Sequence, residues 1–182
     1  MPVGDRFQPE LEEHEDPTTG ARVMRLTSAD AHSHHIYFTA SSYTKDGHIV
    51  FGSERTGSPQ LFLMQMPGGR IVQLTDEEGI RPQLSCVHPL SDIAYFTTDR
   101  LVKQVDLHTF ETEVLYEAPE GFRLTLPSIT ADGSRIAIAY SRVCTFSTET
   151  GRIYATMAEH YYHHPTSCVV TIETDGSGHR VI

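Results

Sequence analysis

Several features that mark particular classes of protein are missing from this sequence. The 182 residues include only three cysteines, Cys86, Cys144 and Cys168, which form no Cys-x-x-Cys pair and no disulfide framework. No apolar run approaches the length of a membrane span. The acidic first 20 residues lack the apolar segment of a secretory signal. We therefore expect a protein of the reducing cytoplasm with no membrane partner.

Positive charge is scarce, with 14 Lys and Arg against 24 Asp and Glu and a net charge of −10. This balance argues against non-specific binding to nucleic acid, although it leaves room for a small basic pocket that takes an anionic ligand. The sequence also lacks a Gly-rich phosphate loop, a Gly-x-Ser-x-Gly elbow and a His-Glu-x-x-His motif. The common signatures of nucleotide, serine-hydrolase and zinc-protease chemistry are therefore absent.

What the sequence does contain is a repeat. Asp46-Gly47 and Asp132-Gly133 are 86 positions apart, which is two periods of 43, and the midpoint falls on Pro89 within a degraded copy of the same unit. Asp-Gly between alternating segments predicts a hairpin turn. In each copy a short strand follows the turn, and further strands are expected after it; the second strands are Ile49 to Ser53, Ile93 to Thr97 and Ile136 to Tyr140.

Short, evenly spaced strands with this period are typical of an all-β fold, the β-propeller with four strands per blade. We expect a single domain over residues 1–182 with blade units at about 30–76, 80–117 and 121–182. Residues 19–27 resemble residues 68–75, so they are predicted to form an outer strand that closes the ring. Because about three to four blades make an incomplete ring, we interpret the chain as the N-terminal part of a longer protein. Closure by oligomerisation is the alternative.

The third unit is interrupted by residues 142–166. Ile153, Met157 and Tyr161 recur at helical spacing before Pro165, which predicts a short helical insertion. On such a helix His160, His163 and His164 lie near one another. Two imidazoles do not complete a metal site, which needs at least three protein ligands, so we predict no high-affinity metal binding here and interpret the cluster as a solvated helix end.

An ordered series of segments resembles the oligogalacturonate lyase family. The segments are DPTTGARVMRLT, HHIYFTASSYTKDGHIVFGS, RLVKQVDLHTFETEVLYEAPEGF and AEHYYHHPTSCVVTIETDGSG. The resemblance implies a seven-bladed propeller that cleaves short galacturonate oligomers by β-elimination in pectin degradation. It also implies a histidine base, an assisting arginine and a divalent cation, usually manganese, that stabilises the enolate-like transition state.

In the family those catalytic and metal-binding residues lie in later blades, in motifs such as Cys-His-Glu-Gly-Pro that this chain lacks. No catalytic or metal residue is therefore assigned here. They are expected beyond Ile182, and the segment is predicted to be inactive and metal-free by itself. The substrate implied for the complete protein is an oligogalacturonate.

Three residues are candidates for contact with that substrate. His34, which matches a family histidine, and Tyr37 and Arg55 could offer hydrogen bonds or charge to a uronate at the central funnel. The alternatives are a packing role for His34 and an ordinary solvated turn arginine for Arg55. Tyr43, Tyr95 and Tyr140 are predicted to be core residues.

Two other functions share these repeats. One is a binding propeller of the TolB or WD40-like type without catalytic activity. The other is the propeller of a prolyl-oligopeptidase-type enzyme, for which this chain supplies no hydrolase domain. The sequence downstream of Ile182 would separate the first of these from the lyase.

Overall fold

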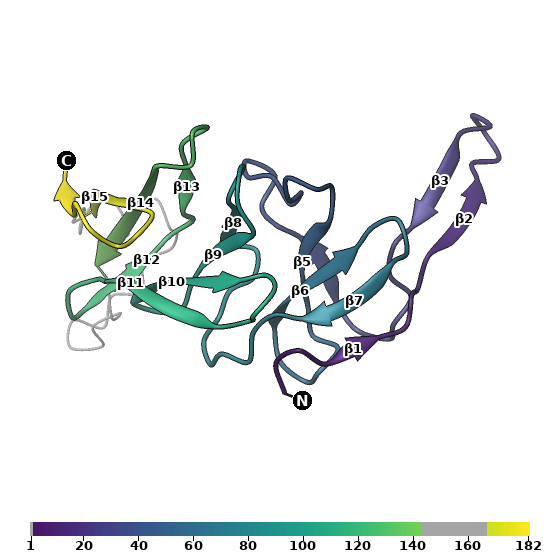
Figure 1. Cartoon of the computed structure of the whole chain (residues 1–182), viewed down its shortest axis with the longest axis horizontal. Coiled ribbons are helices and arrows are strands. Elements are labelled where there is room, and N and C mark those ends of the chain that lie inside the picture. Colours follow the sequence, from purple (N-terminus) through teal and green to yellow (C-terminus); the bar gives the residue numbers. More distant parts are fainter. Residues whose placement is uncertain (1, 143–166) are drawn as a thin grey trace, which may run out of the picture.

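Three antiparallel sheets lie side by side along the molecule (Figure 1). The computed structural model describes residues 2–142 and 167–182, and within these residues it contains strands and turns but no helix. Among the described residues, then, no helix is present that has the length and apolar character needed to cross a membrane. The expected helical insertion falls almost entirely on residues outside this description. The all-β propeller architecture is confirmed.

Blade one is a five-stranded sheet with the order β1-β7-β6-β5-β4. Its strands are β1 (Arg6–Phe7), β4 (Ser33–His35), β5 (Ile49–Ser53), β6 (Gln60–Gln65) and β7 (Arg70–Gln73). The second strand, β5, lies where the repeat predicted it, and two further strands, β6 and β7, follow it as expected. The fifth strand, β1, was not foreseen; it comes from the N-terminus and pairs with the outer strand β7, Arg6 opposite Val72.

Blade two has four strands in the order β11-β10-β9-β8, and blade three has the order β12-β14-β15-β16. The strands of blade two are β8 (Ser85–Val87), β9 (Ile93–Thr97), β10 (Leu101–Asp106) and β11 (Thr112–Glu117). Those of blade three are β12 (Phe122–Leu124), β13 (Ser128–Ile129), β14 (Arg135–Arg142), β15 (Ser167–Glu173) and β16 (Arg180–Val181). Both β12 and β13 pair with β14, so the first strand of this blade is broken in two.

The predicted outer strand within residues 19–27 is present as β3 (Arg22–Arg25), but it does not belong to any of the three blades. It pairs with β2 (Glu12–Glu15) in a separate two-stranded sheet that projects from one end of the molecule (Figure 1). All eight residues of β2 and β3 are exposed. Closure of a ring by this segment stays a prediction.

The Asp-Gly turns have the conformation that their sequence requires. Gly47 has a φ of 80° and Gly133 a φ of 73°, in the left-handed region that favours glycine. In both turns the glycine N–H donates to the carbonyl of a threonine three residues earlier, Thr44 or Thr130, at 3.0 and 2.9 Å. The same local chemistry therefore builds the turn between the first two strands in blades one and three.

The blades pack face to face because alternate residues of each strand point to opposite sides. In β9, Ala94 and Phe96 join the core against blade one, whereas Tyr95 joins the core against blade three. The core between blades one and two includes Val50, Leu61 and Val105, and that between blades two and three includes Val102, Ile138 and Val170. A strand with both faces buried is what a middle blade requires.

A third apolar cluster covers the free face of blade one. Phe51, Phe62, Met64 and Ile71 are buried there under side chains from the N-terminal arm, Phe7 and Leu11, and under Leu26. The N-terminal arm, residues 2–11, thus covers the free apolar face of blade one, as a neighbouring blade covers each face of blade two.

Candidate functional site

The first strands of the three blades converge. The backbone N–H of Tyr37, just after β4, donates to the carbonyl of Gln83, just before β8, at 3.0 Å. The guanidinium of Arg81 donates through Nη2 to the carbonyl of Leu124 in β12 at 2.6 Å. These contacts join the edge strands of blades one, two and three, and they identify the side of the arc that would face a central channel.

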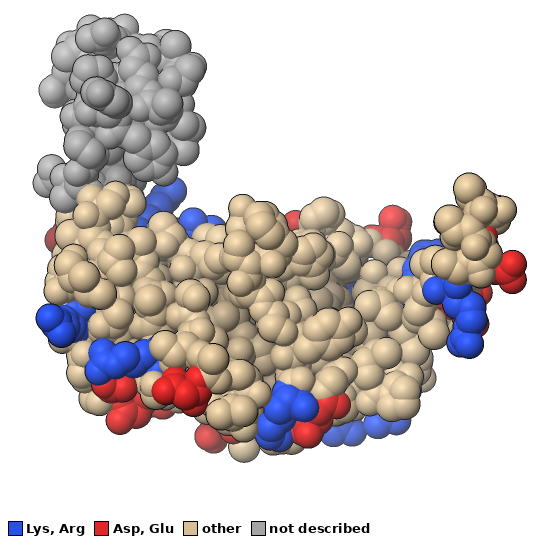
Figure 2. Space-filling view, turned by 90° about the horizontal axis from the view of Figure 1, so that it is seen from above, with Lys and Arg blue, Asp and Glu red and all other residues tan. Residues whose placement is uncertain are grey.

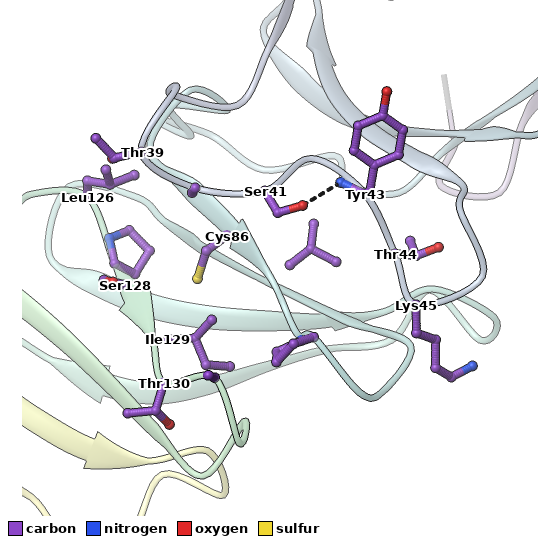
Figure 3. Close-up of a pocket in the computed structure, with 15 residues that line it drawn as sticks. Thr39, Ser41, Tyr43, Thr44, Lys45, Cys86, Leu126, Ser128, Ile129 and Thr130 are labelled. Atoms are coloured by element: carbon purple, nitrogen blue, oxygen red, sulfur yellow. Dashed lines mark hydrogen bonds between the residues drawn. The ribbon is translucent and has the colours of Figure 1, made fainter.

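One cavity lies where these edge strands end. Its volume is about 430 Å³, and its lining comes from the β4–β5 loop, from β8 and from residues 126–131 of blade three. Figure 3 shows hydroxyl groups of Ser41, Thr44 and Thr130 around it, with the Cys86 thiol and the Ile129 side chain at its wall. The Lys45 side chain extends away from Cys86 and Ile129 (Figure 3) and pairs with Asp46 and Asp92, each at 2.8 Å.

The wall of this cavity is chemically inert at neutral pH. Burial raises the pKa of the Cys86 thiol to about 12, so the nucleophilic thiolate is almost absent. Burial also raises the pKa of the Tyr95 phenol, which lies in the same core cluster, to about 12, with a further contribution from Cys86. The hydroxyl-lined space can therefore hold a polar ligand, but it offers no activated nucleophile.

A second cavity lies at the opposite end of the same strands. It has a volume of about 400 Å³ and is lined by His32, His34, Glu54 and residues 80–83. His34 is half-buried against Gly52 and Pro82: a Cβ placed on Gly52 would lie 2.4 Å from its ring. Its Nδ1 atom is 3.1 Å from the carbonyl of His35, so this nitrogen donates and Nε2 is the free ring nitrogen.

The other two predicted contact residues lie elsewhere. Tyr37 is 44% exposed beyond the far end of β4, where its ring and that of Phe38 are 4.4 Å apart. The Arg55 side chain is only 3% exposed and pairs with Glu10 at 2.8 Å. Its guanidinium lies 5.3 to 5.5 Å from the ring centroids of Phe7, Phe51 and Phe62. The structure therefore does not bring His34, Tyr37 and Arg55 together.

Arg55 is neither the solvated turn arginine nor an open contact for substrate. Burial alone would raise the pKa of Glu10, but hydrogen bonds from the backbone N–H groups of Ser28 and Ala29, together with the charge of Arg55, outweigh it and lower that pKa. Glu10 is thus a carboxylate at neutral pH and holds the guanidinium in place. Arg55 fastens the N-terminal arm to blade one.

One core prediction is wrong. Tyr95 and Tyr140 are buried as expected, but Tyr43 is 60% exposed. It lies in the β4–β5 loop, where it forms only an isolated bridge with Ile49. A loop residue outside the ladder has no neighbouring blade to cover it.

Within residues 2–142 and 167–182, no group of three His, Cys, Asp or Glu side chains is arranged to hold a metal ion. The described residues thus do not fit a manganese site. His160, His163 and His164 lie outside the described residues, so the prediction about them stays a prediction.

Arg81 and His32, which sequence reasoning missed, flank His34 in the second cavity. Both precede a first strand in their repeat, and this shared position was the signal that could have found them.

Charges of both signs gather along one edge of the visible face and on the projecting hairpin (Figure 2), where Arg22 pairs with Glu13 and Arg25 with Glu12. Most of the remaining visible surface of the described residues is uncharged (Figure 2). The acidic net charge is therefore not spread evenly over this face.

Comparisons with known proteins agree with this geometry. An oligogalacturonide lyase from Pectobacterium atrosepticum is 28% identical over 122 residues, which are 66% of this chain and 31% of the relative. The crystal structure of an oligogalacturonate lyase from Vibrio parahaemolyticus matches 99% of this chain and 48% of its own, with a TM-score of 0.83 and 21% identity. An oligogalacturonate lyase in complex with manganese matches 100% of this chain and 48% of its own, with a TM-score of 0.82 and 21% identity.

The chain therefore spans about a third of the curated relative and about half of the solved structures that it matches. A family model described as oligogalacturonate lyase matches residues 1–177, which is nearly the whole chain. With three converging blades and a match of this extent, the chain belongs to the oligogalacturonate lyase family.

Proposed function

We propose that this chain is part of an oligogalacturonate lyase, a carbon–oxygen lyase that cleaves short galacturonate oligomers by β-elimination. The observation that carries the proposal is the family match over residues 1–177. In this reaction a base removes the proton α to the uronate carboxylate, and the glycosidic oxygen leaves from the β carbon. A group that stabilises the developing enolate lowers the barrier.

The described residues serve binding rather than bond cleavage in this proposal. His34 lines the second cavity, and Nε2 is the ring nitrogen left free by the bond from Nδ1 to the His35 carbonyl. Tyr37 presents an exposed ring and hydroxyl at the other end of β4. Both are proposed as substrate contacts, on separate parts of an extended oligomer. Arg55 is assigned to the attachment of the N-terminal arm because Glu10 already occupies its guanidinium.

No described residue is proposed as the catalytic base or as a metal ligand. The manganese of the solved relative belongs to that protein. Because the described residues contain no cluster that fits a metal, any divalent cation of the complete enzyme is proposed to bind outside them. The 182-residue chain is accordingly proposed to be inactive by itself.

The proposed lyase activity also suggests where in the cell the protein acts. We propose a cytoplasmic enzyme that acts late in pectin degradation, on oligomers already small enough to be taken up. The three cysteines, which form no Cys-x-x-Cys pair and no disulfide framework, support a reducing compartment. Fractionation of cells that produce the tagged protein would test it, and recovery in a periplasmic or secreted fraction would contradict it.

The test of the activity compares the 182-residue chain with the longer protein encoded by its continued reading frame. Digalacturonate and manganese are supplied, and the ultraviolet absorbance of the unsaturated uronate is followed. The longer protein should release product and lose activity when the metal is chelated, whereas the 182-residue chain should release none. The alternative, a TolB-like binding propeller, predicts that neither protein releases product.

A further inference from the structure

The second cavity concentrates positive and ionisable groups in a protein whose net charge is −10. His32 and His34 line it from blade one, with ring centroids 5.5 Å apart, and Arg81 lines it from the segment that leads to blade two. The acidic side chain in the lining is Glu54, which is exposed. The cavity of about 400 Å³ is large enough for one sugar ring.

Arg81 is fixed in position without being neutralised by any described carboxylate. Its Nη2 donates to the carbonyl of Leu124 at 2.6 Å, which ties the guanidinium to the first strand of blade three. Among the described residues, no Asp or Glu forms an ion pair with it. Its Nε is buried and has no hydrogen-bond partner there. Because Nε has almost no accessible surface, the remaining N–H groups of the guanidinium are the ones through which Arg81, as a lining residue, can meet a ligand.

A second arginine adds to this charge. Burial is the largest influence on the pKa of Arg81 and lowers it; Asp99 raises the pKa and Arg123 lowers it, so these two charges lie near the guanidinium. Arg123 is exposed in β12, and its side chain forms no ion pair with other described residues. Arg81, His32 and His34 thus line the cavity together with Glu54, while the opposite charges of Asp99 and Arg123 act on Arg81 from outside this lining.

We propose that this cavity is an anion subsite that takes the carboxylate of a uronic acid residue. Arg81 is its main ligand, His32 donates a further hydrogen bond, His34 forms part of the wall, and Arg123 raises the local positive potential. A planar carboxylate matches the planar guanidinium donors of arginine, and such charge-assisted hydrogen bonds are stronger than neutral ones. The identity of the ligand rests on the proposed function, whereas the preference for an anion rests on the side chains themselves.

Calorimetric titration of the 182-residue chain tests the subsite. The probes are galacturonate, digalacturonate and neutral galactose, in the presence of a chelator so that no metal contributes. The two uronates should bind and galactose should not, and added salt should weaken uronate binding. Arg81→Gln and Arg123→Gln should each weaken it, Arg81→Gln by at least about tenfold, because one charge-assisted interaction is lost.

Arg22→Gln is the matched control, since it removes one positive charge from the exposed hairpin, where Arg22 pairs with Glu13. It should leave uronate affinity unchanged. Thermal unfolding would show whether Arg81→Gln, which also loses the bond to Leu124, remains folded. Arg123→Gln serves as the second test because no described residue depends on that side chain.

Three results would overturn the subsite: no binding of either uronate, equal binding of galactose and galacturonate, or wild-type affinity in both folded arginine variants. The lyase function and the anion subsite can be rejected independently of each other. A longer protein without lyase activity would reject that function, while uronate binding lost in the variants would still support the subsite. Lyase activity with an unchanged KM in Arg81→Gln would support the function and reject the subsite.

Discussion

The Nε2 atom of His88 in blade two lies 3.1 Å from the carbonyl oxygen of Gly133 in blade three. The Nδ1 atom of the same ring accepts hydrogen bonds from the backbone N–H groups of Leu90 and Ser91, both at 3.0 Å. Since Nδ1 must accept, Nε2 carries the proton and donates to Gly133. One neutral tautomer of His88 thus joins its own turn to the turn of the next blade, as Lys45 joins blade one to Asp92 of blade two.

This contact predicts unequal costs for the same substitution in two turns. Both glycines have positive φ, but a Cβ on Gly133 would lie 2.3 Å from the His88 ring, whereas one on Gly47 meets nothing within 4 Å. Gly47→Ala should therefore cost about 1 kcal/mol of unfolding free energy, for backbone strain alone. Gly133→Ala should cost about 2–4 kcal/mol, because steric overlap adds to that strain. Urea unfolding of both variants measures the difference.

A double variant isolates the steric part. In a His88→Ala chain the obstructing ring is gone, so the cost of Gly133→Ala should fall to about that of Gly47→Ala. An unchanged cost in that background would mean that His88 does not occupy the space beside Gly133.

The Glu10–Arg55 pair predicts a pH-dependent contribution to stability. Glu10→Gln leaves the guanidinium of Arg55, which is 3% exposed, without its counter-ion, and should cost about 3 kcal/mol at pH 7. The folded-state pKa of Glu10 lies below its ordinary value of 4.5. The contribution is therefore complete above that value and is lost as the pH falls through the folded-state pKa.

Denaturant unfolding of the wild type and Glu10→Gln between pH 7 and pH 3 measures this. The two free energies should converge at the acidic end. Glu13→Gln is the control, because Glu13 pairs with Arg22 on the exposed hairpin, where both side chains are well solvated, and should cost under about 1 kcal/mol at every pH. A Glu10→Gln effect as small as that of the control would show that the pair does not hold the N-terminal arm.

The buried thiol predicts selective alkylation. Because burial raises the pKa of Cys86 to about 12, iodoacetamide at pH 8 should modify it at least about 100-fold more slowly in the folded chain than in denaturant. Cys168, which is half-buried in β15, should react faster in the folded chain. Peptide mass mapping over time distinguishes the sites. Equal rates at Cys86 in the folded and denatured chain would show that blades two and three do not stay packed around it.

The blades could be predicted from the sequence because the signals for their turns and strands lie close together along the chain. The Asp-Gly turns and the alternating strands that follow are specified within about ten residues of sequence, and β5 and β9 occupy the expected residues. The pairing of Arg55 with Glu10 was not predicted because the two residues are 45 positions apart, and nothing near Arg55 in the sequence reveals it. The exposure of Tyr43 was not predicted because this residue was assigned to a strand position of the blade, whereas the chain there forms a loop.

The candidate site shows the same contrast between what can be recognised in a short stretch of sequence and what depends on contacts between distant residues. His34 was identified from the family resemblance. Arg81, which lines the same cavity, comes from the segment before β8 in the next blade. It lies beside His34 only because edge strands of successive blades converge, and a single sequence does not display that convergence.

Because the N-terminal arm covers the outward face of blade one, the two ends of the arc differ in how much apolar surface they expose. Phe7, Leu11 and Leu26 pack on the outward face of blade one, whereas in the described residues the outward face of blade three leaves Val169 44% exposed. In an array stabilised by nearest neighbours, opening begins at the unit with fewest partners. In the 182-residue chain by itself, local unfolding should therefore begin at blade three and proceed towards blade one.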